Sequence, residues 1–326
     1  MKSNVNDDGR LRAAVLDDYQ GFAMTAKELV PIRQVIDVDC FREHISDPDD
    51  LVDALAAFDI VVLMRERTPF PASIIRRLPR LRLLVTSGGQ NAAIDIAAAE
   101  EAGIVVCGTR ILTTPTVELT WALILALLRH IPQEDASVRG GEWQQRLGEG
   151  LEGQTLGLLG LGRIGGRVAR VGRAFDMRVV AWSPNLKVER AADVGVTPVS
   201  LQDLLGEADV VSIHLRLGPR TVGLVGEGEL QTMKPTSYLI NTSRAEIIHQ
   251  ESLARALSQG WIAGAGLDVF DQEPLPANHF ARELPNTILT PHIGYVVRQN
   301  YEIFFRDIAE DVTAFLTGKP VRIISP

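Results

Sequence analysis

Short apolar runs alternate with stretches of helical periodicity along most of the 326-residue chain. Runs of this kind are typical of strands that are buried on both faces of a sheet. Their alternation with helices predicts parallel β-sheets built from strand–helix–strand units, an α/β fold. We expect strands at residues 13–16, 34–38, 60–64, 83–86, 104–106, 155–159, 178–182, 210–214, 237–241, 265–269 and 287–290.

The pattern changes in the middle of the chain. Residues 115–128 are apolar on nearly every side, which predicts a helix buried between two layers. Residues 133–152 are polar and rich in glycine and include Trp143, so we expect an extended arm there. Other helices are expected at residues 49–58, 71–78 and 301–316.

A glycine-rich segment follows the strand expected at 155–159. Gly160, Gly162 and Gly165 form the pattern G-x-G-x-x-G, and a helical apolar face begins at Ile164. The first glycine permits a tight turn, the second lets a pyrophosphate approach the backbone, and the third allows the helix to pack closely on the strand. The pyrophosphate would lie at the positive end of that helix. A turn that binds nothing is the alternative, which the flanking strand and helix disfavour.

This loop predicts that a dinucleotide binds to the series of strands that begins at residue 155. We therefore predict two Rossmann-like, doubly wound parallel-sheet domains with a cleft between them. The nucleotide domain, residues 110–294, is expected as an insertion in the substrate domain. That flavodoxin-like domain would consist of residues 1–109 and 295–326, because the last helix comes after the nucleotide-binding series is complete.

The end of the next strand bears on the choice of cofactor. An acid normally follows this strand and binds the ribose hydroxyls of NAD, but Ser183 takes its place here. Without that carboxylate nothing repels the 2′-phosphate of NADP, and Asn185 and Lys187 could bind it together with Ser183. NAD held through neutral contacts is equally compatible, so both NAD(H) and NADP(H) stay open.

Composition excludes several classes of protein. The formal net charge is −8 and the basic residues form no long run, which argues against nucleic-acid binding. Cys40 and Cys107 are the only cysteines, too few for a disulfide framework and in no metal-binding spacing. The polar start, residues 1–10, differs from a secretory signal, and no apolar stretch is long enough to cross a bilayer. We expect a cytoplasmic enzyme without metal, membrane or nucleic-acid partners.

Three polar residues end strands downstream of the glycine loop: Arg244, Glu273 and His292. Open α/β sheets bind their ligands at the carboxyl ends of the strands. A cation, a carboxylate and an imidazole at that edge could bind an anionic substrate and donate a proton to its carbonyl group. Taken singly, each residue has an ordinary alternative as a surface cation, a loop acid or a buried core histidine.

Together with the glycine loop, the segments around these residues resemble the D-isomer-specific 2-hydroxyacid dehydrogenases. The segments are residues 241–245, 267–274 and 290–294. The family includes phosphoglycerate, glycerate and D-lactate dehydrogenases, and the resemblance covers essentially the whole chain. It implies hydride transfer between a nicotinamide cofactor, NAD(H) or NADP(H), and a small 2-keto or 2-hydroxy acid. It also implies a homodimer.

The resemblance implies a role for each of the three residues. Arg244 would hold the carboxylate and the carbonyl oxygen of the substrate through its fixed charge and its fork of donors. His292 would be the general acid in reduction and the general base in oxidation. Glu273 would orient the imidazole and stabilise its protonated form.

Further residues carry over from the same family. The expected cofactor contacts, beside the three glycines, are Arg163, Ile164, Ser183, His214, Thr242 and Asp268. Asp268 would accept from the nicotinamide carboxamide, unless it only caps a strand end. The expected substrate contacts are Ser87, Gly88, Gly89, Arg244 and Tyr295, the first three through a turn whose amides hold the carboxylate. Arg65 or Arg67 would also reach the substrate, or would form a solvated charge cluster instead.

Three positions depart from the family pattern. Ala245 replaces a glycine, Arg216 a proline and Tyr295 a small residue. They put the identity of the substrate in question more than the class of reaction. Two rival functions remain: a dinucleotide-sensing binding protein like the family's transcriptional corepressors, and a dehydrogenase of another small anion such as phosphite or formate. The histidine–glutamate pair favours keto-acid reduction over formate oxidation, because the latter protonates no carbonyl group.

Overall fold

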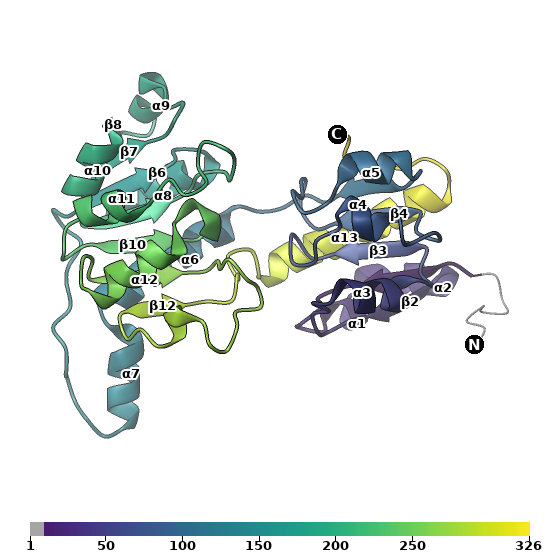
Figure 1. Cartoon of the computed structure of the whole chain (residues 1–326), viewed down its shortest axis with the longest axis horizontal. Helices are drawn as coiled ribbons and strands as arrows, with labels where there is room; N and C mark the ends of the chain where they lie inside the picture. The colour runs from purple at the N-terminus through teal and green to yellow at the C-terminus, as the bar shows by residue number, and fades with distance from the viewer. Residues whose placement is uncertain (1–9) are drawn as a thin grey trace. The chain divides into compact units, whose positions relative to one another are not determined.

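A computed structural model describes residues 10–326 and divides into two compact units (Figure 1). Unit 1 consists of the chain up to Leu112 together with Val297–Pro326, and unit 2 consists of Thr113–Val296. Each unit has helices on both faces of one parallel sheet, which confirms the predicted class of two doubly wound α/β domains. The polar segment at the start of the chain falls, up to residue 9, outside the described residues.

Unit 1 is built on a five-stranded parallel sheet in the order β2-β1-β3-β4-β5. The strands are β1 (Arg12–Val15), β2 (Asp37–Cys40), β3 (Ile60–Leu63), β4 (Leu83–Thr86) and β5 (Val105–Gly108). The helices are α1 (Phe22–Thr25), η1 (Lys27–Leu29), α2 (Val30–Val35), α3 (Pro48–Leu55), α4 (Ala72–Ile75), α5 (Ile96–Glu101) and α13 (Arg298–Leu316). Helices α3, α4 and α5 pack on one face, and α13 covers the other with Phe304, Phe305 and Ile308.

Unit 2 is built on a seven-stranded parallel sheet in the order β12-β11-β10-β9-β6-β7-β8. The strands are β6 (Thr155–Leu159), β7 (Arg178–Trp182), β8 (Thr197–Pro198), β9 (Val210–Ile213), β10 (Tyr238–Asn241), β11 (Gly264–Leu267) and β12 (Thr287–Leu289). The longer helices are α6 (Thr114–Leu128), α7 (Ile131–Arg139), α8 (Arg163–Ala174), α10 (Leu201–Glu207) and α12 (Gln250–Ser258). The shorter ones are α9 (Val188–Ala192), α11 (Glu227–Thr232), η2 (Ala245–Ile247) and η3 (Phe280–Arg282).

The strand order of unit 2 reverses its direction at β6. Helices α6 and α8 lie against one face of the sheet, and α10, α11 and α12 lie against the other. Strand β6 pairs with β7 on one side and with β9 on the other. Ligands of open α/β sheets bind at the carboxyl ends of the strands beside such a switch point. The residues that follow β6, β7 and β9 therefore surround the first candidate site.

Two strand expectations differ from the structure. The strand expected at residues 34–38 is wrong in position, because α2 begins with Pro31 in its first turn and continues to Val35. Strand β2 starts only at Asp37 and has polar residues at every second position, as suits the edge of the sheet where it lies. Strand β8 was not expected at all, since two residues carry no hydrophobic pattern.

The segment 133–152 is only partly an extended arm. Its first residues belong to α7, and an irregular coil follows up to β6. Figure 1 shows α7 and this coil outside the layers of unit 2. Trp143 and Leu147 expose 72% and 92% of their surface. The arm therefore presents large apolar side chains of the kind that protein interfaces cover.

Helix α6 is strongly apolar because it is buried within unit 2. It is 15 residues long and packs Trp121, Leu123 and Ile124 into the core.

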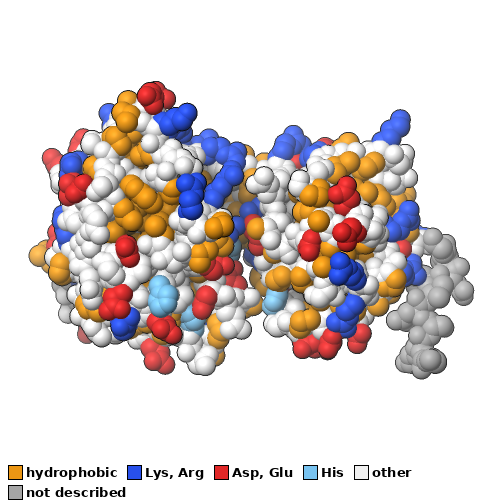
Figure 2. All heavy atoms as spheres, turned by 45° about the horizontal axis from the view of Figure 1, so that its top comes forward, with side chains coloured by type: hydrophobic (Ala, Val, Ile, Leu, Met, Phe, Trp, Pro, Cys, Tyr) orange, Lys and Arg blue, Asp and Glu red, His pale blue; other side chains and the backbone are white. Residues whose placement is uncertain are grey.

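No helix within residues 10–326 is long and apolar enough to cross a membrane. In the view of Figure 2, acidic and basic side chains both occur on the visible face of each unit.

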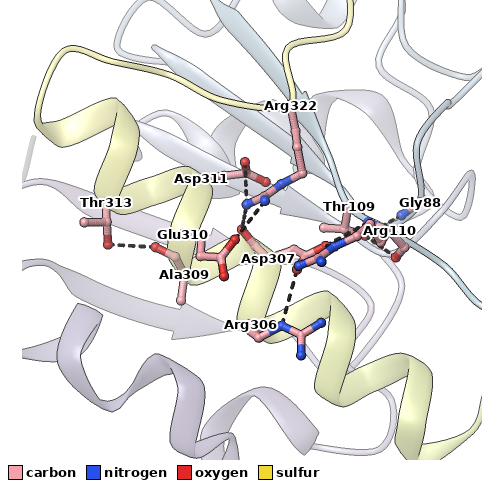
Figure 3. Close-up of polar contacts among 10 residues, drawn as sticks. All are labelled: Gly88, Thr109, Arg110, Arg306, Asp307, Ala309, Glu310, Asp311, Thr313 and Arg322. Carbon is pink, nitrogen blue, oxygen red and sulfur yellow. Dashed lines mark hydrogen bonds and ion pairs between the residues drawn. The ribbon is translucent and has the colours of Figure 1, made fainter.

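A buried charge cluster joins three parts of unit 1 (Figure 3). Asp307, which is fully buried on α13, accepts from Nε, Nη2 and the backbone amide of Arg110 at 2.9, 2.6 and 2.9 Å. Arg322, near the C-terminus, lies 3.0 Å from Oδ1 of the equally buried Asp311 and 2.8 Å from Oε2 of Glu310. The cluster ties both the segment after β5 and the C-terminal segment to α13.

The pKa values of the two buried carboxyls in this cluster are shifted in opposite directions. Burial would raise the pKa of Asp307, but the hydrogen bonds from Arg110 outweigh it and lower that pKa. Burial raises the pKa of Asp311 from 3.8 to about 7, and the nearby Arg322 opposes this only in part. A raised carboxyl pKa means that the folded protein binds the proton more tightly than the unfolded chain does. The stabilisation from Asp311 is thus present below pH 4 and is lost as the pH rises to about 7.

We predict that Asp311→Asn becomes progressively more stable than the wild type as the pH rises. The neutral amide does not titrate, so the difference in free energy of unfolding should grow between pH 4 and 7 and then level off. Its upper bound is about 4 kcal/mol, from about 1.4 kcal/mol for each unit of pKa shift. Urea unfolding of both proteins at pH 5 and pH 8 measures it; an equal difference at the two pH values would contradict the prediction. Asp307→Asn is the control and should lose stability most at pH 8, where Arg110 faces an ionised partner.

Candidate functional site

The glycine loop, residues 160–165, connects β6 to α8. Gly160 has φ +104°, and a Cβ there would lie 2.6 Å from the carbonyl oxygen of His214. A Cβ on Gly165 would collide with the carbonyl oxygen of Gly160, so the helix packs directly on the loop. Gly162, the N-cap of α8, has no atom within 4 Å of its Cβ position and no side-chain cap. The helix thus presents its first amides to open space beside the switch point.

Residues from two neighbouring loops surround this space. His214 follows β9, and its Nε2 lies 2.9 Å from Oγ of Ser212. Burial lowers the pKa of His214 to about 4, so the ring is neutral at physiological pH. On the other side, Ser183 is half-buried after β7, whereas Arg163 is exposed at the start of α8. The structure therefore brings the expected cofactor residues of β6, β7 and β9 to one edge of the sheet.

Glu273 and His292 form a close pair at the same edge of the sheet. They follow β11 and β12, which are neighbours. Nδ1 of His292 lies 2.7 Å from Oε2 of Glu273, and the amide of Phe270 donates to the other oxygen, Oε1, at 2.9 Å. The two side chains expose 21% and 26% of their surface. Because Nδ1 faces the carboxylate, Nε2 is the ring nitrogen left to face a substrate.

Asp268 holds the turn that carries His292. Its Oδ1 accepts from Oγ1 of Thr290 at 2.6 Å and from the amide of Ile293 at 2.8 Å, and its Oδ2 accepts from the amide of Gly294 at 2.9 Å. Burial raises the pKa of Asp268, and these hydrogen bonds oppose the rise. We did not predict this positioning role from the sequence. The sequence does contain a signal for it, because an acid follows one strand and a hydroxyl residue follows the neighbouring strand.

Arg244 and Thr242 follow β10, the next strand of the sheet. The guanidinium of Arg244 is half-buried, and its Nη1 donates to the carbonyl oxygen of Ser243 at 2.8 Å. Asn241 donates its side-chain amide to the carbonyl oxygen of Arg244 at 2.9 Å, which fixes the backbone where η2 begins. The hydroxyl of Thr242 lies 2.9 Å from that of Thr120 on α6. Arg244 and the Glu273–His292 pair thus follow three consecutive strands.

Tyr295 lies beside this pair. Its side chain is almost fully buried, and its ring meets that of His292 edge-on, with centroids 5.7 Å apart. Replacement of a small residue by tyrosine therefore adds an aromatic wall next to the imidazole.

The expected substrate turn, Ser87 to Gly89, belongs to unit 1 and follows β4. The amide of Ser87 donates to the carbonyl oxygen of Leu63 at 2.9 Å, and that of Gly88 donates to Oγ1 of Thr109 at 2.7 Å. Both amides are therefore engaged within unit 1. Two amides of the turn that we expected to bind a carboxylate therefore already donate to groups of the fold.

The arginines after β3 are also built into unit 1. Arg65 has φ +59°, donates Nη1 to the carbonyl oxygen of Ser87 at 3.1 Å, and places Nη2 3.2 Å from Oε1 of Glu66. Arg67 donates to the carbonyl oxygen of Asp17 at 2.8 Å and stacks on the ring of Tyr19 at 4.6 Å. The two guanidiniums are held by neighbouring groups and are not a solvated cluster.

The edge of unit 2 fits a dinucleotide. A bound pyrophosphate requires open space at the loop and free amides at the start of the helix, and Gly162 and the uncapped first turn of α8 supply both. It also requires close packing of the helix on the loop, which the absence of a side chain at Gly165 allows. Among residues 10–326, no group of three or more His, Cys, Asp or Glu side chains is placed to hold a metal ion.

Comparison with known proteins identifies the family. The model of the NAD binding domain of the D-isomer specific 2-hydroxyacid dehydrogenases matches residues 121–294, more than half of the chain. The chain belongs to the D-isomer specific 2-hydroxyacid dehydrogenases, which confirms the resemblance found in the sequence.

Individual relatives agree with this assignment. A glyoxylate reductase of Aeropyrum pernix is 42% identical over 256 residues, 76% of this chain and 76% of that protein. A D-3-phosphoglycerate dehydrogenase of Synechocystis is 36% identical over 294 residues, 89% of this chain but 52% of that protein. The solved structure of a phosphoglycerate oxidoreductase from Vibrio cholerae superposes with a TM-score of 0.90 at 36% identity and covers 94% of this chain and 99% of that one.

We predict that Gly162→Ala folds normally but binds a nicotinamide dinucleotide at least about tenfold more weakly. The added methyl group meets no protein atom, so the melting temperature should change by less than about 4 °C. It would, however, occupy the space through which a pyrophosphate approaches the backbone. Calorimetric titration and thermal unfolding measure the two effects. Gly165→Ala should instead lower the melting temperature, and unchanged cofactor affinity in Gly162→Ala would argue that the phosphates bind elsewhere.

Proposed function

We propose that this member of the D-isomer specific 2-hydroxyacid dehydrogenase family reduces a short 2-keto acid to the D-2-hydroxy acid, using NADH or NADPH. We further propose that it works in the cytoplasm as a homodimer, in which a second copy covers the exposed Trp143 and Leu147 of the arm. The observation that carries the proposal is the 2.7 Å contact between Nδ1 of His292 and Oε2 of Glu273.

In the proposed reaction His292 moves the proton. The reduced nicotinamide, when bound, supplies a hydride to the carbonyl carbon. Nε2 of His292 donates a proton to the carbonyl oxygen, and Glu273 stabilises the imidazolium that must be present before this step. The anchored carboxylate of Glu273 also prevents rotation of the ring, because the amide of Phe270 holds its second oxygen. In oxidation the neutral imidazole accepts the proton.

Arg244 is proposed to bind the anionic end of the substrate. A guanidinium offers a fixed charge and paired donors, which suit a carboxylate and an adjacent carbonyl oxygen. Negative charge grows on that oxygen as the hydride arrives, and a preorganised cation stabilises it without reorganisation. Tyr295 is the further substrate contact proposed in unit 2. In unit 1 the contacts proposed at Ser87, Gly88 and Gly89 do not use the amides of Ser87 and Gly88, because these already donate within that unit.

Glyoxylate is the first substrate to test. The relative from Aeropyrum pernix is named a glyoxylate reductase, and a buried tyrosine beside His292 suits a keto acid with little or no side chain. A panel of glyoxylate, hydroxypyruvate, pyruvate and larger 2-keto acids, run with NADH and NADPH in parallel, ranks the candidates by kcat/KM. A protein that binds the cofactor but reduces none of them would favour the dinucleotide-sensing alternative. Turnover of formate or phosphite alone would favour the other rival.

We predict that His292→Ala lowers kcat for 2-keto acid reduction about 100- to 10,000-fold, the usual contribution of a positioned acid. Cofactor affinity should stay within about threefold, because the side chain acts on the substrate. Steady-state kinetics and calorimetric titration give the two quantities. His130→Ala is a matched control: His130 also has positive φ, +50° against +53°, but lies at the start of α7. Near-normal turnover of His292→Ala would refute the proton-transfer role.

We predict that Glu273→Gln lowers kcat roughly tenfold or more, but only while His292 is present. The carboxylate acts through the imidazole, so the two substitutions should not be additive. In the His292→Ala background, Glu273→Gln should therefore change kcat by less than about twofold. A full double-mutant cycle measures this coupling. Additive losses would mean that Glu273 contributes by another route, such as the shape of the loop that it closes with Phe270.

A further inference from the structure

Two arginines from different elements border the segment that follows β7. Arg220, in the segment after β9, donates Nη1 to Oδ1 of Asn185 at 3.3 Å. The strand order β9-β6-β7 places β6 between the two segments that this bond connects. The guanidinium of Arg220 therefore reaches across the carboxyl end of β6, where the glycine loop begins.

The second arginine lies against the first turns of α8. Arg190, on α9, places Nε 3.5 Å from the carbonyl oxygen of Leu161 in the glycine loop. Its Nη2 lies 3.5 Å from the Cβ position of Gly166, so the guanidinium lies within van der Waals contact of the helix. Figure 1 shows α9 beside the end of the sheet formed by β7 and β8. Two positively charged side chains thus border the segment after β7, one from α9 and one from the segment after β9.

The charges of this region favour an anion with two negative charges. Residues 183–192 contain one acid, Glu189, against Lys187 and Arg190, and Arg220 adds a third cation. Ser183 occupies the position where a carboxylate would repel a phosphate. All three cations are exposed, and the 3.3 Å bond between Arg220 and the neutral Asn185 is long, so the guanidinium can exchange it for a phosphate oxygen at little cost.

We propose that this chain selects NADP(H) over NAD(H), and that Arg220 and Arg190 bind the 2′-phosphate on the adenosine ribose. The proposal rests on the proposed function only in that the chain must bind a nicotinamide dinucleotide. The planar fork of donors on an arginine matches the oxygens of a phosphate group. Ser183 contributes by its size and neutrality, which leave the phosphate room beside the strand end.

The test is direct titration of the purified protein with NADPH and with NADH, followed by calorimetry, so that no turnover is required. The wild type should bind NADPH about tenfold or more tightly than NADH, the worth of one charge-assisted contact. Arg220→Ala should weaken NADPH binding about 10- to 100-fold and leave NADH within about threefold. Arg190→Ala should act in the same direction. Adenosine 2′,5′-bisphosphate, which lacks the nicotinamide, should show the same losses.

Arg178→Ala is the matched control. It removes the same charge from the amino end of β7, where Arg178 pairs with Glu207 at 2.6 Å, and should leave the NADPH to NADH ratio unchanged. Ser183→Asp should reverse the preference, with weaker NADPH binding and unchanged or better NADH binding. Tighter binding of NADH by the wild type, or equal loss of both cofactors in Arg220→Ala, would overturn the proposal. These binding results stand even if no 2-keto acid is reduced, which would overturn the proposed function alone.

Discussion

The position of His292 beside Glu273 in unit 2 depends on the carboxylate of Asp268. This group accepts a hydroxyl hydrogen bond and two amide hydrogen bonds from residues on either side of His292. His292 itself has φ +53°, a conformation that costs a residue with a β-carbon on the order of 1 kcal/mol or more. Hydrogen bonds to a charged acceptor contribute more than that. Because Glu273 follows Asp268 by five residues, the group that holds the turn and the group that holds the ring come from the same strand end.

The glycine loop and the Glu273–His292 pair lie at one edge of the sheet because every strand of unit 2 is parallel. All carboxyl ends lie on one side, so the segments after β6, β7, β9, β10, β11 and β12 converge there. Close backbone contact at the glycine loop makes this possible: Gly160 lies against His214, and α8 packs on Gly160 through Gly165. A side chain at Gly160 would collide with the backbone after β9, and one at Gly165 would push α8 away from the loop. The two glycines thus set the position of the start of α8 relative to the neighbouring strand ends.

The sequence indicates the parts of this structure that depend on local pattern. Apolar runs located most of the strands, and the flanks of Gly160 predicted a dinucleotide loop between a strand and a helix, where β6 and α8 lie. The order of Arg244, Glu273 and His292 identified the family. The two-residue strand β8, the start of β2 and the helical first part of the arm carry too little periodicity to be recognised. Contacts between distant segments, such as Arg220 with Asn185 or Asp268 with the turn at His292, depend on strand order, which no local pattern encodes.

Unit 1 uses its own carboxyl edge in a different way. Asp17 after β1 and Arg65 after β3 both have positive φ, and both are anchored: Asp17 by Thr68 and His44, Arg65 by the carbonyl oxygen of Ser87. Charged groups that already have partners add little attraction for a ligand, but they fix the shape of the surface around them. Under the proposed function, the chemistry takes place at the strand ends of unit 2, which carry His292 and Arg244.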